Sequence, residues 1–195
     1  MNRPPSRQRG ATLMIALIML AVILLLGIAS ASLLMLDERA ARNHRAHEQA
    51  RMAAQAALDD ACEEIRRGIR IGVAHAFPAK NGCHSDSERL GLCLGSAQAT
   101  GWKFTQLTGA EEGSAIYGQF TGNQPPNPGD KIPAPRYLIE LVAGTPPATI
   151  LYRLSAIGFG RDGAQVLLQS IVLRRIDAAG RAQCVPIGWR ALAAA

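Results

Sequence analysis

Cysteine and histidine are the residue types in this chain best suited to chemistry, and each occurs four times. Cys83 and Cys93 enclose nine residues, a short loop that a disulfide can close, and we favour that bond. Cys62 and Cys184 would then pair, and their longer loop would restrict the unfolded chain more strongly. Four cysteines allow three pairings, so the sequence alone leaves the connectivity open.

A zinc site would use the same segment differently, with Cys83, His84 and Cys93 as ligands. No C-x-x-C spacing supports such a site. Free thiolates are also disfavoured in an oxidising compartment, which is where we expect all four cysteines to lie. The sequence therefore favours disulfides and predicts no metal.

Further polar residues gather in the segment that follows the apolar N-terminal region. His44 and His47 could share a helix face near Glu48, but solvated helix surface explains them better than a metal site. A calcium site would need a D-x-D-x-D-G loop, and the sequence has none. Acidic and basic residues at spacings of three and four favour ion pairs on a helix surface; they are Asp59, Asp60, Glu63, Glu64, Arg66 and Arg67.

A glycine-rich motif near the C-terminus matches a dinucleotide-binding fingerprint but precedes the wrong element. The segment from Gly158 to Gly163 reads G-x-G-x-x-G. A nucleotide-binding loop must open a helix that faces the pyrophosphate, whereas this loop leads into the strand-like "AQVLLQSIVL". Arg161-Asp162-Gly163 instead predicts a hairpin turn. No G-x-S-x-G motif occurs either, so we find no catalytic constellation and expect neither an enzyme nor a cofactor.

The N-terminal region contains 26 uncharged residues, Ala11 to Leu36, which follow Arg3, Arg7 and Arg9. A helix of that length can cross a bilayer, and the arginines would keep the N-terminus on the cytoplasmic side. A secretory signal peptide has a shorter apolar run, although Ala29-Ser30-Ala31 could serve as its cleavage site. A plain signal anchor is a second alternative. We favour a prepilin-type leader, because the basic segment ends in "RQRG" at the apolar boundary.

Cleavage between Gly10 and Ala11 would remove that leader and retain the apolar helix. Glycine suits such a site because its backbone can enter a peptidase groove without a side chain in the way. Residues 37–70 contain no Pro, have no Gly before Gly68 and are rich in helix formers. Residues 12 to about 70 should therefore form one rod about 85–90 Å long. An apolar stripe at steps of three and four should face the domain; it comprises Ala50, Ala54, Leu58, Ala61, Ile65 and Ile69.

The rest of the chain is predicted to be β-rich. The clearest strands are "RYLIELVAG", "TILYRLSAIGFG" and "AQVLLQSIVLRR", and "WKFTQLT" and "SAIYGQFT" are further candidates. Residues 79–101 and the segment "TGNQPPNPGDKIPAP" are expected to be loops. An antiparallel meander packed on the apolar stripe of the helix gives an α+β fold.

This arrangement resembles a type IV pilin. The segment "RQRGATLMIALIMLAVILLLGIASASLLMLDERAARNHRAHEQARMAAQAALDDAC" is similar to the PilX-type minor pilins, as are "YRLSAIGFGRDGAQVLLQSIVLRR" and Trp189-Arg190. The likeness is poor over about residues 80–130. It implies the type IV pilin fold, in which a long N-terminal helix packs on a C-terminal antiparallel β-sheet. The implied regions are a leader at 1–10, a transmembrane and filament-core helix at 11–36, its amphipathic continuation at 37–75 and a periplasmic β-rich domain at 76–195.

The resemblance implies assembly as the function, in a tip or initiation complex of the type IV pilus. The implied partners are other minor pilins, the major pilin, a prepilin peptidase, a large PilY1-like tip adhesin and lipid of the inner membrane. The implied location is the inner membrane, crossed once with the domain in the periplasm, and then the pilus. N-methylation of Ala11 after cleavage belongs to the same expectation.

One departure from the general pilin pattern concerns the start of the mature helix. Major pilins usually carry Phe first and Glu fifth after the cleavage site, where this chain has Ala11 and Ile15. That Glu pairs with the α-amino group of a neighbouring subunit, since an unpaired carboxylate in an apolar core costs several kcal/mol. We interpret Ile15 as a sign of a position at or near the filament tip. The alternative is that Ile15 is one more lipid-facing residue.

Charge and size bear on the remaining alternatives. Removal of the three leader arginines lowers the formal net charge from +6 to +3, and no basic cluster is interleaved with aromatic residues. We therefore do not expect nucleic acid as a main partner. A minor pseudopilin of a type II secretion system would typically carry a larger inserted domain. A membrane-anchored periplasmic enzyme or sensor would need a pocket with convergent polar groups.

Overall fold

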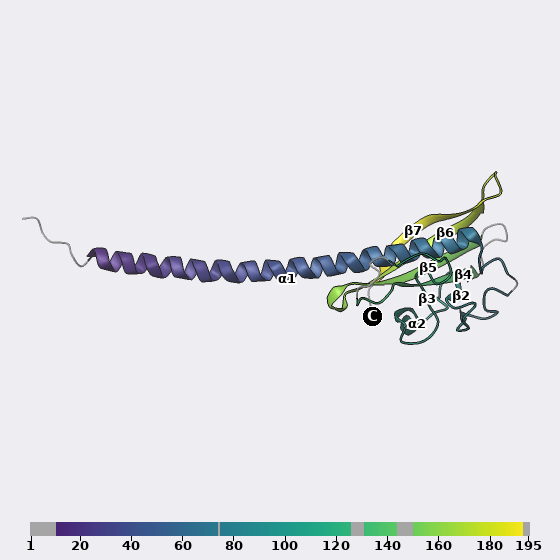
Figure 1. Cartoon of the computed structure of the whole chain (residues 1–195), viewed down its shortest axis with the longest axis horizontal. Helices are drawn as coiled ribbons and strands as arrows, with labels where there is room; N and C mark the ends of the chain where they lie inside the picture. The colour runs from purple at the N-terminus through teal and green to yellow at the C-terminus, as the bar shows by residue number, and fades with distance from the viewer. Residues whose placement is uncertain (1–10, 74, 126–130, 144–149, 193–195) are drawn as a thin grey trace, which may run out of the picture. The chain divides into compact units, whose positions relative to one another are not determined.

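The computed structural model describes residues 11–73, 75–125, 131–143 and 150–192 (Figure 1). The chain divides into two units, Met1–His44 and Arg45–Ala195. The first element, α1 (Ala11–Arg67), has residues in both units. The predicted leader, residues 1–10, lies outside the described residues.

In the first unit, α1 exposes large apolar side chains along its length from Leu13 to Leu36. None of the helices formed by the described residues is long and apolar enough to cross a membrane. The predicted transmembrane segment at 11–36 includes side chains that lie outside the described set, at positions 11, 29 and 31–33. It stays a prediction.

In the second unit, α1 ends at Arg67, which is earlier than predicted. Gly68 follows with a φ of 65°, and its amide donates a hydrogen bond to the Glu64 carbonyl (2.9 Å). A glycine in this left-handed conformation is a common helix stop. Ile69 therefore lies beyond the helix and is 40% exposed, although it was predicted to belong to the stripe. The rest of the predicted stripe is confirmed, since Ala50, Ala54, Ala61 and Ile65 are buried and Leu58 is partly buried against the core. The helix also buries Ala46, Ala53 and Ala57, so most of its buried side chains are small.

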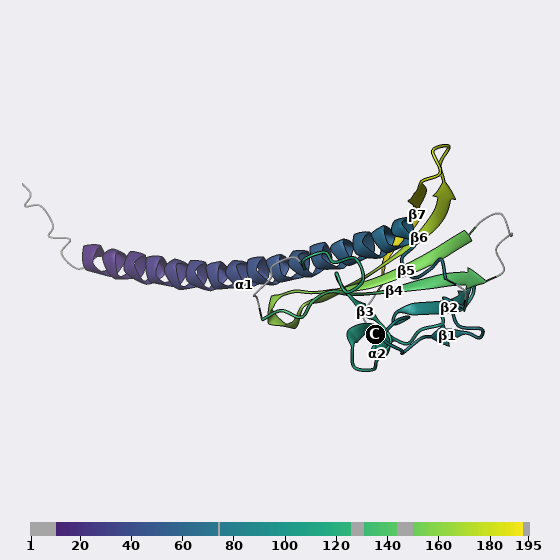
Figure 2. The same cartoon turned by 45° about the vertical axis from the view of Figure 1, so that its right-hand side comes forward.

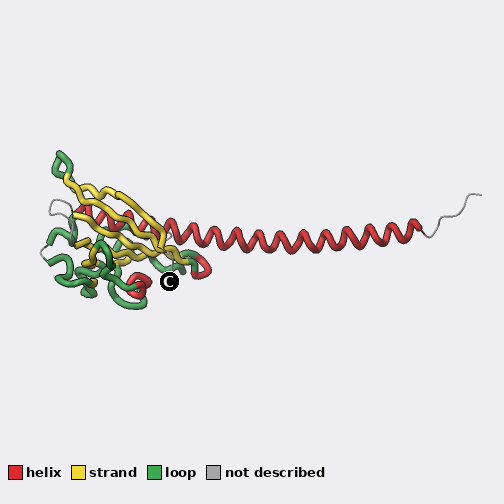
Figure 3. The backbone as a smooth tube through the Cα atoms, turned by 180° about the vertical axis from the view of Figure 1, so that it is seen from behind, coloured by secondary structure: helices red, strands yellow, loops and turns green. Residues whose placement is uncertain are grey.

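A mostly antiparallel sheet follows α1, with the strand order β1-β2-β4-β5-β6-β7 and β3 paired to β4. All pairs are antiparallel except β2–β4, which is parallel. The α+β class and the antiparallel meander through β4, β5 and β6 are confirmed, and β7 extends that meander. Figure 3 shows strands of the sheet side by side. The strands are β1 (Gly82–Cys83), β2 (Leu92–Ser96), β3 (Ala115–Ile116), β4 (Arg136–Ala143), β5 (Ile150–Phe159), β6 (Gln165–Ile176) and β7 (Ala182–Leu192).

Alternate residues of the strands pack on the two faces of the sheet. On one face, Tyr137, Leu154 and Val172 pack with Ala61 and Ile65 of α1. On the other face, the core includes the short helix α2 (Phe104–Thr108); its buried members are Cys93, Leu107, Leu138, Ile157, Phe159 and Leu167. Figure 2 shows α1 and α2 on opposite sides of the sheet. The sheet is therefore the middle layer of the second unit.

Several local predictions fail where short segments depend on distant partners. Within the predicted strand at 102–108, residues 104–108 form the helix α2 instead. The Lys103 amide donates a hydrogen bond to the Gln106 side chain (2.9 Å), which stabilises the start of this helix. The predicted loop at 79–101 contains β1 and β2, because these strands pair with each other and with β4. The predicted strand at 114–121 shrinks to β3. The strand β7 was not predicted, because Pro186 and Gly188 lower its apparent strand propensity.

The glycine-rich motif forms the predicted hairpin turn between β5 and β6. Asp162 and Gly163 adopt positive φ values of 55° and 76°. A short 3-10 turn, η1 (Arg161–Gly163), leads directly into β6. A strand follows the motif, as expected, so the loop does not open a helix toward a pyrophosphate.

Candidate functional site

The apolar surface of α1 is the first candidate site. Its described large side chains between Leu13 and Leu36 are 48–69% exposed, and their sequence positions place them all round the helix. A helix that is apolar all round is stable only against other apolar helices or lipid chains. Ile15 belongs to this surface and is 57% exposed. Gly10 lies outside the described residues and Ala11 is the first residue of α1, so cleavage and methylation there remain predictions.

The four cysteines form two disulfides, in the pairs that we favoured from the sequence. Cys62 of α1 is bonded to Cys184 of β7, with a Cα–Cα distance of 5.6 Å. Cys83 of β1 is bonded to Cys93 of β2, directly opposite in the register, with a Cα–Cα distance of 4.0 Å. No cysteine is free for a zinc site.

The other candidate metal ligands are not brought together. His44 and His47 lie exposed on α1. The Nδ1 atom of His84 lies 3.4 Å from the Asp86 carboxylate. Within the described ranges, no group of three His, Cys, Asp or Glu side chains is placed to hold a metal ion.

Asp60 is buried, which corrects its prediction as helix surface. Its carboxylate accepts hydrogen bonds from the Gly118 amide (2.8 Å), the Thr121 hydroxyl and the Asn123 side-chain amide (2.7 Å). A carboxylate can be buried at tolerable cost when several donors surround it. Asp60 thus fixes the loop at 117–123 onto α1.

Glu64 is also buried, again contrary to the prediction. It forms a two-contact ion pair with Arg70 (2.6 and 2.8 Å) and accepts a hydrogen bond from the Tyr137 hydroxyl (2.9 Å). Burial, and then the Glu64 charge, raise the pKa of Tyr137. The Arg70 guanidinium lies over the Phe120 ring and donates to the Leu90 carbonyl (2.6 Å). This network joins the end of α1 to β4 and to two loops.

The sequence holds a signal that could have separated these residues from true surface. Asp60 lies three residues after Ala57 and seven after Ala53, and Glu64 lies four residues after Asp60 and seven after Ala57. These spacings place the two acidic residues on the same helix face as the two alanines. Glu63 lies off that face and pairs with Arg66 and Arg67, as expected. The stripe of small residues thus continues through two acidic positions.

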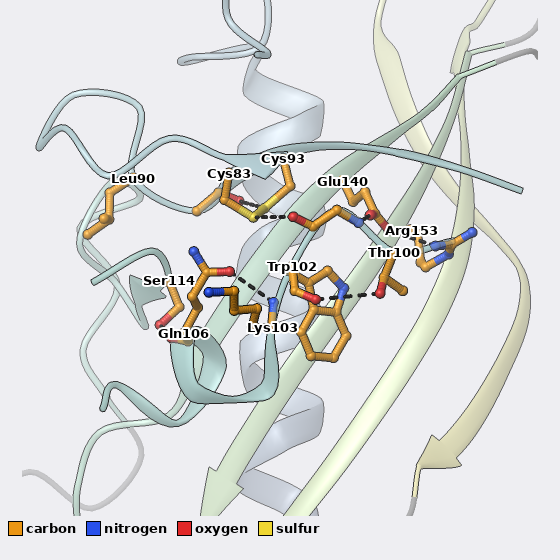
Figure 4. Close-up of a disulfide and its surroundings, with 12 residues drawn as sticks. Cys83, Leu90, Cys93, Thr100, Trp102, Lys103, Gln106, Ser114, Glu140 and Arg153 are labelled. Atoms are coloured by element: carbon orange, nitrogen blue, oxygen red, sulfur yellow. Dashed lines mark hydrogen bonds and ion pairs between the residues drawn. A yellow bond between two sulfur atoms is a disulfide. The ribbon is translucent and has the colours of Figure 1, made fainter. Parts of the chain in front are cut away.

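A second buried ion pair lies on the opposite face of the sheet, near the β1–β2 disulfide (Figure 4). Glu140 of β4 pairs with Arg153 of β5 (2.9 Å) and accepts a hydrogen bond from the Gly101 amide. Arg153 also donates to the Ser96 carbonyl (2.7 Å). Burial raises the pKa of the Glu140 carboxyl, while Gly101 and Arg153 oppose this rise. The pair anchors the segment between β2 and α2 to the sheet.

A comparison with family models finds a match to the N-terminal segment. Residues 9–59 match the family model described as PilX N-terminal. This match confirms the resemblance to PilX-type minor pilins over those residues. No curated protein and no solved structure matches the chain.

Proposed function

We propose that this chain is a minor pilin that takes part in type IV pilus assembly, within a complex at the filament tip. The match of residues 9–59 to the PilX N-terminal family carries the proposal. The α1 helix packed on a mostly antiparallel sheet in the second unit is consistent with it. The specific type IV pilin fold is part of the proposal.

The apolar part of α1 serves two environments in this proposal. It is held by the lipid of the inner membrane before assembly, with the domain in the periplasm. It then packs against the helices of other minor pilins and of the major pilin. Support comes from the absence of charge between Ala11 and Leu36 and from the exposure of the large side chains there.

The tip position is supported by Ile15. A subunit without a carboxylate at this position cannot pair with the α-amino group of the subunit above it. A subunit at the tip has no such neighbour. The segment at about 80–130 carries partner specificity in this proposal, including contact with a PilY1-like adhesin, because the likeness to the PilX type is weakest there.

Intact-mass measurement of the full-length protein extracted from membranes tests the pilin assignment. We expect a mature chain that starts at Ala11 and carries one methyl group. A Gly10→Val variant should keep residues 1–10, whereas the matched Gly27→Ala variant, whose added Cβ meets nothing within 4 Å, should be processed normally. Retention of the leader in the wild type would refute the proposal.

Immunogold labelling of sheared pili tests the tip position. The wild-type protein should label filament ends. An Ile15→Glu variant should also label along the filament, because it regains the carboxylate that ordinary subunits use. Wild-type label distributed along the length would contradict the tip assignment and leave the pilin assignment standing.

A further inference from the structure

The strand β7 offers an unpaired edge. It is the last strand of the sheet, and β6 is its one partner among the described strands. Its residues from Pro186 to Ala191 are exposed, including Ile187 (59%) and Trp189 (65%). A long exposed edge is a template for pairing with another strand.

A groove of about 310 Å³ runs between this edge and α1 within the second unit. Its floor is apolar and includes Leu154, Leu168 and Val172. Pro186 and Trp189 form one wall. The volume suits one or two side chains of an added strand, because alternate residues of a strand point to the same face.

Asp59 lies on the helix side of the groove, and its carboxylate has no counter-ion among the residues that the structure describes. Within the same residues it makes no ion pair and accepts no hydrogen bond, whereas Glu63 on the next turn is paired with Arg66 and Arg67. Asp59 is an exposed residue, and partial burial raises the pKa of its carboxyl. Arg51 also lines the groove but lies two helical turns away, about 12 Å along α1, and is directed to Glu48 (3.6 Å).

We infer that the groove between α1 and β7 receives an extended peptide segment of a partner protein, which pairs with β7 and inserts a Lys or Arg side chain toward Asp59. The aliphatic stem of such a side chain would cover the apolar floor while its charged end reaches the carboxylate. The exposed indole of Trp189 offers a second contact for the cation. The inference concerns the second unit alone and holds whether or not the chain is a pilin.

Three synthetic peptides test the inference against the full-length protein in detergent with both disulfides intact. The first is fluorescein-labelled Thr-Val-Thr-Lys-Thr-Val-Thr, and the others replace Lys with norleucine or with Glu. Fluorescence anisotropy should show that the Lys peptide binds about fivefold tighter than the norleucine peptide, the upper range for a half-exposed ion pair. The Glu peptide should bind weakest.

Variants assign the preference to the groove. Asp59→Asn should abolish the preference for Lys over norleucine and leave the norleucine peptide unaffected. The matched variant Glu112→Gln removes an exposed carboxylate that does not line this groove, and it should change nothing. Trp189→Ala should weaken all three peptides.

Three outcomes would overturn the inference. The first is absence of binding by all three peptides. The second is equal affinity of the wild type for the Lys and Glu peptides. The third is a concentration-dependent dimer that Trp189→Ala dissociates, because the occupant of the groove would then be a second copy of this chain.

Discussion

Gly158 of β5 lies so close to Ala50 of α1 that a Cβ atom at position 158 would overlap the Ala50 carbonyl oxygen. Gly160 has the same relationship to Ala46. These two glycines are the first part of the motif that matches a dinucleotide fingerprint. Their role in this fold is to let the backbone of the sheet approach the backbone of the helix.

Replacement of Gly158 by Ala should therefore destabilise the second unit. Neither backbone can move far in a packed layer, and overpacking of this kind costs about 1–3 kcal/mol, so we expect a loss of about 3 kcal/mol in the free energy of unfolding. Urea denaturation measures it. Gly188→Ala in β7 is the matched control, since its Cβ would meet nothing within 4 Å, and it should stay within about 0.5 kcal/mol of the wild type. Equal effects at the two positions would contradict this packing.

The pair formed by Glu64 and Arg70 should be costly to break from one side. Arg70→Met leaves the Glu64 carboxylate buried with the Tyr137 hydroxyl as its remaining side-chain donor, and we expect a loss of about 3–5 kcal/mol in the free energy of unfolding. Arg66→Met breaks a half-exposed pair with Glu63 and should cost less than about 1 kcal/mol.

The double variant Glu64→Leu/Arg70→Met gives an internal check, because it removes both charges. It should be more stable than Arg70→Met alone. A double variant less stable than Arg70→Met would contradict the unpaired Glu64 charge as the cause of the lost stability. The Glu64 carboxylate would then stabilise the fold mainly through its other contacts.

The carboxyl of Glu140 should make stability depend on pH. Burial raises its folded pKa above the ordinary value of 4.5, so between the unfolded and folded pKa values the native state binds more protons. The stabilisation linked to this group is present in full below about pH 4.5 and is lost as the pH rises through the folded pKa. The free energy of unfolding of the wild type, relative to the non-titrating Glu140→Gln variant, should therefore fall as the pH rises from 4.5. A difference that rises with pH would show that Arg153 outweighs burial.

The two disulfides should contribute unequally to stability. The bond between Cys62 and Cys184 spans 122 residues and that between Cys83 and Cys93 spans 10. Loop-closure entropy assigns about 5 kcal/mol to the first and about 3 kcal/mol to the second. Paired Cys→Ser replacements, compared by guanidinium denaturation, measure both values. The reverse order would mean that entropy of the unfolded chain is not the main contribution.

The sequence by itself determined the features that are local or periodic. The uncharged segment and the helix formers after it predict α1, the Asp162-Gly163 turn predicts the β5–β6 hairpin, and alternation in three apolar segments predicts β4, β5 and β6. Gly68 ends the helix by its own backbone freedom, although the predicted end lies a few residues later. The same residue patterns led to the PilX resemblance that the match over 9–59 confirms.

Only the tertiary structure decided the roles of residues whose partners are distant in the chain. Asp60 and Glu64 have the composition of helix surface, and they are buried because the loop at 117–123 and Arg70 bring donors to them. In the sequence, Glu140 is a charged residue within an apolar strand. In the fold, Arg153 of β5 lies opposite it and pairs with it. The strands β1, β2 and β7 exist because neighbouring strands supply their hydrogen bonds. A polar group can be buried only where hydrogen-bond donors meet it in space. These donors are distant from it in the sequence, so local sequence patterns do not reveal them.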